Sequence, residues 1–246
     1  MYENFASVYD RLMSDADYEK RTEYIISLFE EYDKKPTLLL DLCCGTGTFS
    51  CAFSKRGISV IGADVSEDML SEAKEKAEKE NEDILFLCQN ATELDLYGTV
   101  DGAVCLMDSL NHITDYEDFE NAIKKVSLFL EKDRLFIFDL NTEYKAKNIL
   151  GENSFISEEN GVFLAWQNEY DKGNLENNIY LDFFVEKENG DYERISETVT
   201  EKVYTEEQVK NALEESGLSL VAILDDMKKT PPADKSQRVF YITRKI

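Results

Sequence analysis

The sequence predicts an α/β protein with a doubly wound, mostly parallel sheet and an inserted antiparallel β meander. Short apolar runs alternate with helical patterns from residue 37 to residue 141, which is the order of a parallel sheet covered by helices. Residues 151–204 change to an alternation of period two, which is typical of antiparallel strands. The last two strand patterns, residues 218–224 and 238–245, are joined by a short connection. A parallel crossover needs a longer one, so an antiparallel pair is expected.

Two helices are expected before the first strand. Apolar residues three and four positions apart between residues 2 and 13 predict an amphipathic helix. A second helical pattern runs from about Tyr18 to Tyr32 and ends before Pro36.

The alternating region supplies five strands and three helices. The expected strands are 37–42, 59–65, 84–90, 102–108 and 134–141. The expected helices are 47–57, 66–81 and 115–133. Ser66 is a suitable N-cap for the second of these helices, and Gly57 marks the end of the first.

The insertion is expected to contain three strands, at 161–171, 175–187 and 192–204. In the middle strand Ile179, Leu181, Phe183 and Val185 share one face. The sequences "KGN" and "ENGD" between the strands have turn chemistry. We therefore expect one domain made of residues 1–150 and 205–246, with 151–204 as the insertion. After it, Thr205 and Gln208 form a capping box for a helix that stops at Gly217.

Composition disfavours several classes of protein. The chain has 246 residues, with 27 basic and 51 acidic side chains and a net charge of −24, and such a charge repels nucleic acid backbones. No apolar run is long enough for a membrane span, and the start "MYENFASVYD" has no signal-peptide pattern, so a cytoplasmic protein is expected. The five cysteines lack paired zinc-ligand spacing and are expected to be buried, reduced thiols.

A glycine turn follows the first strand in "LLLDLCCGTGTFS". Gly45 and Gly47 lie where ligands bind in open α/β sheets, outside the carboxyl ends of the strands. Without Cβ atoms the backbone can be approached closely, although a tight turn without a ligand has the same pattern. Asp64 ends the second strand, and a carboxylate there can accept hydrogen bonds from both hydroxyls of a ribose. Together these features predict a cofactor that contains a nucleoside.

Two residues favour S-adenosylmethionine (SAM) over a dinucleotide. Ser50 occupies the position of the third glycine of a dinucleotide fingerprint. Asp41 precedes the turn, where a carboxylate would oppose a pyrophosphate but would suit an amino group and a positive sulfonium.

On these motifs the chain resembles the class I SAM-dependent methyltransferases, a family of small Rossmann-like proteins with a seven-stranded sheet. "DLCCGTG" is similar to their first motif, with Cys43 in place of the first glycine, and "GADVSEDML" resembles the second. "FLCQNATELDL" resembles the third, with Asn90 where an aspartate is usual. "VCLMDSLNHI" and "FIFDLNT" resemble the fourth motif and the fifth strand, and "YENFASVYDRLM" a lid segment. The resemblance covers residues 1–145 and the last forty, but not the meander.

The resemblance implies a set of cofactor-binding residues: Tyr9, Asp41, Cys43, Gly45, Thr46, Gly47, Asp64, Val65, Met69, Asn90, Ala91 and Leu106. In it Asp64 would hold the ribose, and Val65 and Met69 would flank the adenine. Asn90 would accept a hydrogen bond from the adenine amino group, though without charge.

Methyl transfer by direct displacement depends mainly on alignment of donor and acceptor, so no triad and no metal are expected. A base is needed only if the acceptor holds its proton at neutral pH. The candidates are Asp108, which could orient an amine or favour a cationic donor, and His112, the only histidine. His112 also fits a loop residue bonded to backbone.

The leading hypothesis is a SAM-dependent methyltransferase that acts on a small molecule. The alternatives are an NAD-linked oxidoreductase on a similar sheet and a non-catalytic SAM-binding module; a protein or RNA acceptor also stays open. The meander would roof the acceptor pocket or join two copies in a homodimer. Packing is the favoured role of its bulky aromatic residues, Trp166, Tyr170, Tyr180 and Phe184.

Overall fold

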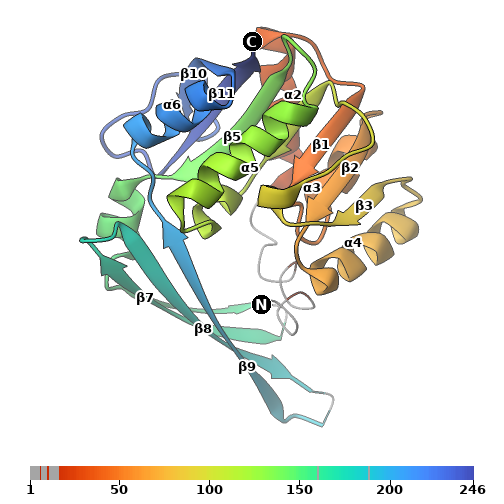
Figure 1. Ribbon diagram of the computed structural model, residues 1–246. Helices are drawn as coiled ribbons and strands as arrows, with labels where there is room; N and C mark the ends of the chain where they lie inside the picture. The colour runs from red at the N-terminus through yellow and green to blue at the C-terminus, as the bar shows by residue number, and fades with distance from the viewer. Residues whose placement is uncertain (1–5, 7–9, 11–16, 160, 188) are drawn as a thin grey trace.

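The computed structural model describes residues 6, 10, 17–159, 161–187 and 189–246, and it contains two sheets (Figure 1). The larger has seven strands in the order β10-β11-β5-β4-β1-β2-β3, and the smaller has four in the order β6-β7-β8-β9. The strands of the larger sheet are β1 (Leu38–Leu42), β2 (Ser59–Asp64), β3 (Leu85–Cys88), β4 (Gly102–Cys105), β5 (Leu135–Asn141), β10 (Leu218–Asp225) and β11 (Arg238–Lys245).

The helices follow the order expected from the sequence. The α-helices are α2 (Tyr18–Tyr32), α3 (Thr48–Ser54), α4 (Glu67–Glu80), α5 (Tyr116–Phe129) and α6 (Glu206–Glu215). Three shorter helical segments are η2 (Ala91–Glu93), η3 (Ser109–His112) and η4 (Lys145–Leu150). The helix predicted over residues 2–13 lies largely outside the described residues; of that segment, only Ala6 and Asp10 are described.

The topology confirms the predicted fold class. Strands β1 to β5 pair in parallel, whereas β11 is antiparallel to both β5 and β10. The strand order reverses beside β1, where the chain crosses from β3 to β4. In doubly wound sheets the carboxyl ends of the strands at such a reversal form the ligand crevice.

N-cap residues determine where helices α4 and α6 begin. The Ser66 side chain accepts a hydrogen bond from the Met69 N–H at 3.3 Å and caps α4. Thr205 and Gln208 bond to each other's backbone in a capping box at the start of α6. Both caps were predicted, because a hydroxyl at the N-cap satisfies a backbone donor that has no partner inside the helix.

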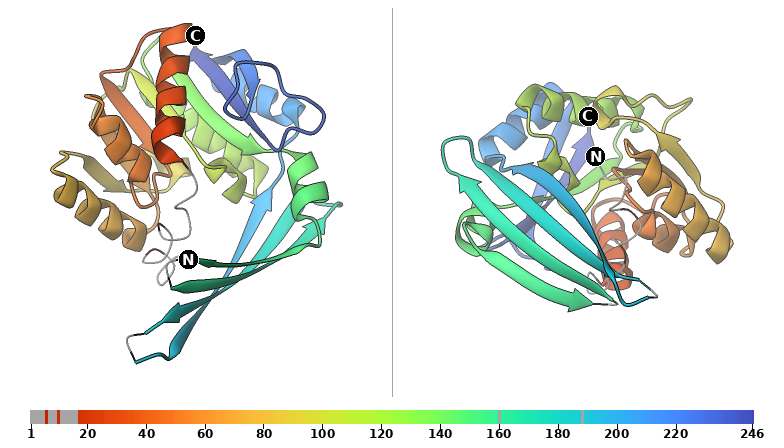
Figure 2. Two further views of the ribbon diagram at one scale, coloured as in Figure 1. Left: turned by 180° about the vertical axis from the view of Figure 1, so that it is seen from behind. Right: turned by 90° about the horizontal axis from the view of Figure 1, so that it is seen from below.

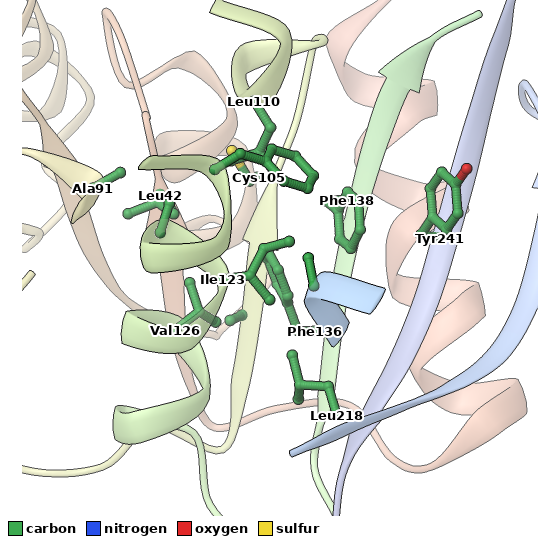
Figure 3. Packing of buried hydrophobic residues seen from close by; sticks show 14 of the residues in the cluster. Leu42, Ala91, Cys105, Leu110, Ile123, Val126, Phe136, Phe138, Leu218 and Tyr241 are labelled. Carbon is green, nitrogen blue, oxygen red and sulfur yellow. The ribbon is translucent and has the colours of Figure 1, made fainter. Parts of the chain in front are cut away.

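Two apolar layers cover the larger sheet because successive strand residues point to opposite faces. Phe136 and Phe138 of β5 pack with α5 and α6 (Figure 3). Between them Ile137 points to the other face, where it packs with α2 and α3. Figure 2 shows α2 lying across the face opposite α5.

One expectation about the cysteines is wrong. All five are free thiols, and Cys51 and Cys105 are buried, but Cys88 is exposed. Cys88 ends β3, the edge strand of the sheet, so no further strand covers it on one side.

The meander has four strands where three were predicted: β6 (Ser154–Glu159), β7 (Val162–Asp171), β8 (Glu176–Glu186) and β9 (Tyr192–Lys202). The missed strand, β6, is an edge strand that is exposed along most of its length and contains two serines and two glutamates. A strand with so little buried surface has no clear period-two signal. The shared face in β8 is confirmed, since Phe183 is buried and Leu181 and Val185 pack beside it.

This inner face of the meander contacts the α/β domain. Val162 and Phe183 pack against Met69 of α4 and against Ala6. Figures 1 and 2 show the meander below the carboxyl ends of the parallel strands. The meander therefore covers the carboxyl edge of the larger sheet, at which a ligand is expected.

The turn between β1 and α3 yields a stability test. Gly45 and Gly47 both have positive φ, at +53° and +69°, but a Cβ on Gly47 would lie 2.8 Å from the Ala73 Cβ, whereas one on Gly45 would meet nothing within 4 Å. Each alanine substitution should lower the free energy of unfolding by about 1–2 kcal/mol, because alanine disfavours the left-handed backbone. Gly47→Ala should lower it by about 1–3 kcal/mol more, because the added Cβ overpacks against α4. Urea unfolding measures both variants. Equal losses would show that contact with α4 does not restrict residue 47.

Candidate functional site

The glycine turn is held in an unusual backbone conformation. Cys43, Gly45 and Gly47 all have positive φ, of 56°, 53° and 69°. The Cys44 N–H donates to the Ala63 carbonyl at 3.1 Å, and the Gly47 N–H donates to the Cys44 carbonyl at 3.0 Å. Because L-residues pay about 1–2 kcal/mol for this conformation, Cys43 keeps it only through these surrounding contacts.

Asp64 ties the turn to the end of β2. One carboxylate oxygen accepts the Gly45 N–H at 2.8 Å, and the other accepts the Ser66 N–H at 2.9 Å. Burial raises the pKa of Asp64, while the hydrogen bonds from Ser66 and Gly45 act in the opposite direction. Each oxygen has a second lone pair, so the carboxylate can also accept two ligand hydroxyls.

Asp41 is buried at the end of β1, and the Ser50 hydroxyl donates to it at 2.5 Å. Burial, with a smaller contribution from Asp64, raises the pKa of Asp41 to about 7, although the Ser50 hydrogen bond lowers it. Among the described residues, no lysine or arginine forms an ion pair with Asp41. A buried carboxyl without a cation is the feature that a positively charged ligand would complete.

These groups fit the cofactor that the sequence predicts. A small cavity at the turn is lined by Asp41, Cys43, Gly45, Thr46 and Leu106, among others. The space in front of Gly45 is open, so a ligand can approach its backbone. Asp41 can pair with an amino group or a sulfonium, and Asp64 with ribose hydroxyls.

The other predicted cofactor residues are distributed around this edge. Val65 follows Asp64 and is 63% exposed, Leu106 and Ala91 are buried, and Met69 is buried beneath the meander. Tyr9 lies outside the described residues.

Asn90 has local partners. Its side-chain oxygen accepts hydrogen bonds from the Thr92 N–H at 3.0 Å and from the Thr92 hydroxyl at 3.1 Å. Both lone pairs of this oxygen are thus engaged, and contact with an adenine amino group stays a prediction.

Asp10 contacts both the glycine turn and α4. Its carboxylate accepts a hydrogen bond from the Thr46 hydroxyl at 2.6 Å and forms an ion pair with Lys76 of α4 at 2.5 Å. No sequence pattern indicates this contact, because the partners are more than thirty residues apart along the chain.

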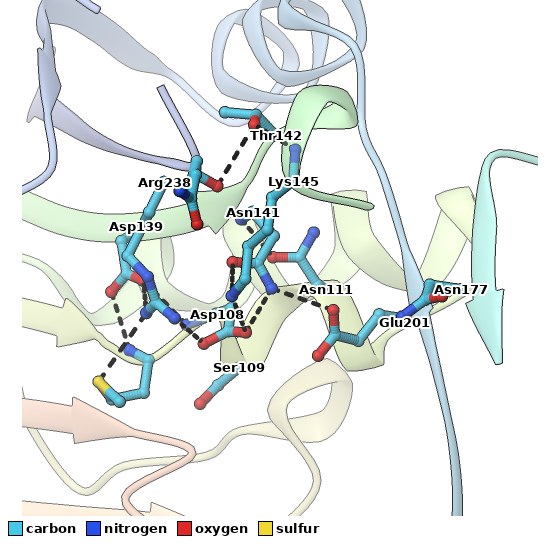
Figure 4. A network of polar contacts seen from close by, with 12 residues as sticks. Asp108, Ser109, Asn111, Asp139, Asn141, Thr142, Lys145, Asn177, Glu201 and Arg238 are labelled. Atoms are coloured by element: carbon cyan, nitrogen blue, oxygen red, sulfur yellow. Dashed lines mark hydrogen bonds and ion pairs between the residues drawn. The ribbon is translucent and has the colours of Figure 1, made fainter. Parts of the chain in front are cut away.

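A buried ionic network adjoins the turn at the ends of β4 and β5 (Figure 4). Arg238 bridges two carboxylates, with its guanidinium 2.5 Å from Asp139 and 2.6 Å from Asp108. The Asn141 amide donates to Asp108 and, at 3.0 Å, to Glu201 of β9. Lys145 donates to the Asn141 side-chain oxygen at 2.8 Å.

The network gives Asp108 partners that the sequence analysis did not foresee. Burial alone would raise its pKa, but Arg238, Lys145 and His112 hold the pKa of Asp108 well below its usual range. The carboxylate is therefore ionised and held in place. His112 lies in η3 with its side chain exposed. Arg238 and Glu201 could not be found from sequence spacing, because β11 and β9 bring them to this edge from distant parts of the chain.

Comparison with known proteins identifies the family. Residues 39–133 match the family model of a methyltransferase domain. Two relatives, both named "Putative methyltransferase", are each 32% identical over 247 residues. The one from Geobacillus sp. (strain WCH70) aligns over 99% of both chains, and YqeM of Bacillus subtilis (strain 168) over 100% of this chain and 97% of its own. The crystal structure of a SAM-dependent methyltransferase from Clostridium acetobutylicum ATCC 824 is 30% identical, with a TM-score of 0.89 over 99% of this chain and 98% of that one.

The chain belongs to the class I SAM-dependent methyltransferases. Of the alternatives that the sequence left open, the family selects SAM rather than NAD as the cofactor of this methyltransferase. Within its described residues, no helix is long and apolar enough to cross a bilayer. In the same part of the chain, no group of three or more His, Cys, Asp or Glu side chains is placed to hold a metal ion.

The ionic network of the methyltransferase yields a second stability test. Arg238→Met would leave Asp108 and Asp139 buried without their main partner, at a loss of about 3–5 kcal/mol in the free energy of unfolding. Their folded-state pKa values would then lie above the unfolded values, so stability should fall as pH rises, and the deficit should be larger at pH 8 than at pH 5.

The control is Lys79→Met, which removes an exposed ion pair with Glu75 and should leave stability unchanged at both pH values. Denaturant unfolding of the two variants and the wild type gives the comparison. An Arg238→Met deficit that is small, or independent of pH, would contradict the electrostatic role of the network.

Proposed function

We propose that this methyltransferase holds SAM at the glycine turn and transfers its methyl group to a small-molecule acceptor placed under the meander. The observation that carries the proposal is the buried Asp41 carboxyl, which has no cationic partner among the described residues and lies beside the open backbone of Gly45. Asp41 would pair with the positive methionine end of SAM, and Asp64 would hold the ribose.

The remaining cofactor contacts follow from position. The exposed Val65 would pack on the adenine, and Leu106 at the end of β4 would face the methyl group. Asp10 accepts a hydrogen bond from Thr46 beside the glycine turn, and a lid formed by the residues around it stays a prediction. Tyr9 and Asn90 stay in the proposed set on the resemblance alone.

SAM supplies a methyl carbon already activated by the sulfonium, so the protein mainly has to align the acceptor and exclude water. The meander is suited to both tasks, because the apolar part of its inner face packs onto α4 and Ala6 at the carboxyl edge of the sheet. We therefore propose residues 151–204 as the acceptor-binding element and residues 1–150 with 205–246 as the SAM-binding domain.

The acceptor is proposed to be small because the roofed edge favours a molecule that can be enclosed, and the net charge of −24 disfavours RNA. A base role for His112 stays a prediction, as do the homodimer contact and the cytoplasmic location.

Calorimetric titration with SAM and with S-adenosylhomocysteine tests the cofactor site. Asp64→Ala should weaken binding by at least about tenfold, because hydrogen bonds to a charged group contribute about 1.5–3 kcal/mol. Glu67→Gln is the matched control, since it removes a nearby carboxylate in the exposed first turn of α4, and it should bind like the wild type. Wild-type protein that binds neither compound would refute the proposed function.

The pH dependence of SAM binding tests the role of Asp41. A positive ligand favours the ionised carboxyl, so the pKa of about 7 in the unliganded protein should fall on binding, with release of a proton. Affinity should rise with pH from 5.5 to 7, by up to about tenfold per unit. Asp41→Asn should lose this slope. The same slope in the variant would assign the proton to another group.

A further inference from the structure

A row of polar side chains crosses the base of the meander. Tyr170 of β7 is directly opposite Asn177 of β8, which is directly opposite Glu201 of β9. Residues that are paired in this way point to the same face, with Cβ atoms about 4.5–5.5 Å apart. Glu201 meets Asn141 of β5, so the row faces the ends of β4 and β5. Figure 4 shows Asn177 beside Glu201.

Hydrogen bonds fix the orientation of the Asn177 amide. The Trp166 indole N–H can only donate, and it donates to the Asn168 oxygen at 2.8 Å. The Asn168 nitrogen donates to the Asn153 carbonyl at 3.1 Å, so this amide cannot be flipped without losing both bonds. Asn177 must therefore present its nitrogen to the Asn168 oxygen, at 3.1 Å.

The Asn177 oxygen is consequently left as a buried acceptor. Asn177 is 0% exposed, and its oxygen has no hydrogen-bond donor within the described part of the protein. The buried Tyr170 hydroxyl in the same row also has none. An unsatisfied buried polar atom lowers stability by about 1–3 kcal/mol. A ligand with N–H groups would remove this penalty by donating to the Asn177 oxygen.

The charged groups next to this polar row carry a net negative charge, which favours binding of a cation. Arg238 and Lys145 are balanced by Asp108 and Asp139, which leaves the carboxylate of Glu201 in excess. Burial and repulsion from Asp108 raise the pKa of Glu201, whereas His112, Lys145 and the Asn141 amide lower it. On the far side of β9, Lys202 already pairs with Glu176 at 3.4 Å.

We propose that Glu201 and Asn177 bind the amine group of the methyl acceptor, so that the enzyme methylates an amine nitrogen. An ammonium group carries the missing positive charge and up to three N–H donors, which two neighbouring acceptors can share. A neutral alcohol has a single donor and no charge. This inference rests on the proposed function, since it names the substrate class of the same site.

The proposed methyl transfer from SAM to the amine nitrogen conserves atoms and electrons. The ammonium group gives one proton to the Glu201 carboxylate, and the nitrogen lone pair then forms the new N–C bond. As the S–C bond breaks, its electron pair goes to sulfur and leaves a neutral thioether. Glu201 is therefore a catalytic residue in this scheme, and Asn177 holds the amine in position.

The test uses methylammonium as the probe and the full-length protein with ¹³C-labelled carboxyl groups. The Glu201 signal is assigned by its absence in Glu201→Gln, and its pKa is measured by NMR titration. Methylammonium should lower this pKa by about one unit or more, as an adjacent opposite charge does. Tetramethylammonium at equal ionic strength has the same charge but no N–H group, and it should leave the pKa unchanged.

Glu193 is the internal control. It lies on the same strand and face, is exposed and pairs with Lys187, so the two cations should affect its signal equally. If methylammonium shifts Glu201 no more than tetramethylammonium does, the inference is wrong.

The Asn177→Leu variant tests whether Asn177 binds the amine or only stabilises the fold. The variant removes the unsatisfied acceptor and also the hydrogen bond to Asn168, whose oxygen keeps the Trp166 donor. It should therefore unfold close to the wild-type temperature, yet it should lose the methylammonium effect on Glu201. A variant that keeps the effect overturns the role of Asn177, and one that melts well below the wild type shows that Asn177 is structural.

Calorimetry with SAM keeps the two proposals apart. Glu201→Gln and Asn177→Leu should bind SAM within about twofold of the wild type, because neither residue touches the glycine turn. Wild-type protein that fails to bind SAM would refute the proposed function whatever the amine result. Normal SAM binding without a methylammonium shift would refute only the amine inference.

Discussion

The bridge from Arg238 to Asp108 and Asp139 is the interaction on which the site edge depends. It joins the first residue of β11 to β5 and to the residue before η3, so the antiparallel end of the sheet is locked to its parallel centre. Asp139 also accepts the backbone N–H groups of Met107 and Asp108, at 2.8 and 2.9 Å. Charges buried this deeply are tolerated only when they are paired and hydrogen-bonded. The bridge therefore holds the turn after β4 in one conformation.

From this bridge the network reaches the meander through two asparagine side chains, Asn141 and Asn111. Asn141 ends β5, donates to both Asp108 and Glu201 and accepts from Lys145. Asn111 adds a second link, because it accepts the Asn141 N–H at 2.9 Å and donates to the Lys202 carbonyl at 2.6 Å. The inserted sheet is thus anchored by polar contacts at its base and by Val162 and Phe183 at its far end. Between these anchors it covers the edge at which the parallel strands end.

On the cofactor side of the site, local features could be predicted from the sequence, and contacts between distant segments could not. Gly45, Gly47, Asp41 and Asp64 were predicted to lie together, because a strand end and the following turn are local features. Asn90 and Met69 were placed by resemblance alone, and their contact with the adenine stays a prediction. In the structure the Asn90 side chain caps η2 through the local Thr92 N–H, whereas the packing of Met69 against the meander depends on the tertiary structure. Strand β6 was missed because an exposed edge strand needs no apolar alternation. Cys88 was expected to be buried, but only the sheet order reveals that β3 is an edge.

The sequence by itself determined the doubly wound fold, the helix caps, the glycine turn and the two acidic residues near it. Each of these depends on the spacing of residues within a few turns of chain, and that spacing is visible in one dimension. The tertiary structure alone decided which charges meet. Arg238, Asp108 and Glu201 come from three distant segments, and whether a carboxylate is paired or left in excess depends on burial and on neighbours across strands. The proposed acceptor side of the site therefore could not be predicted from the sequence.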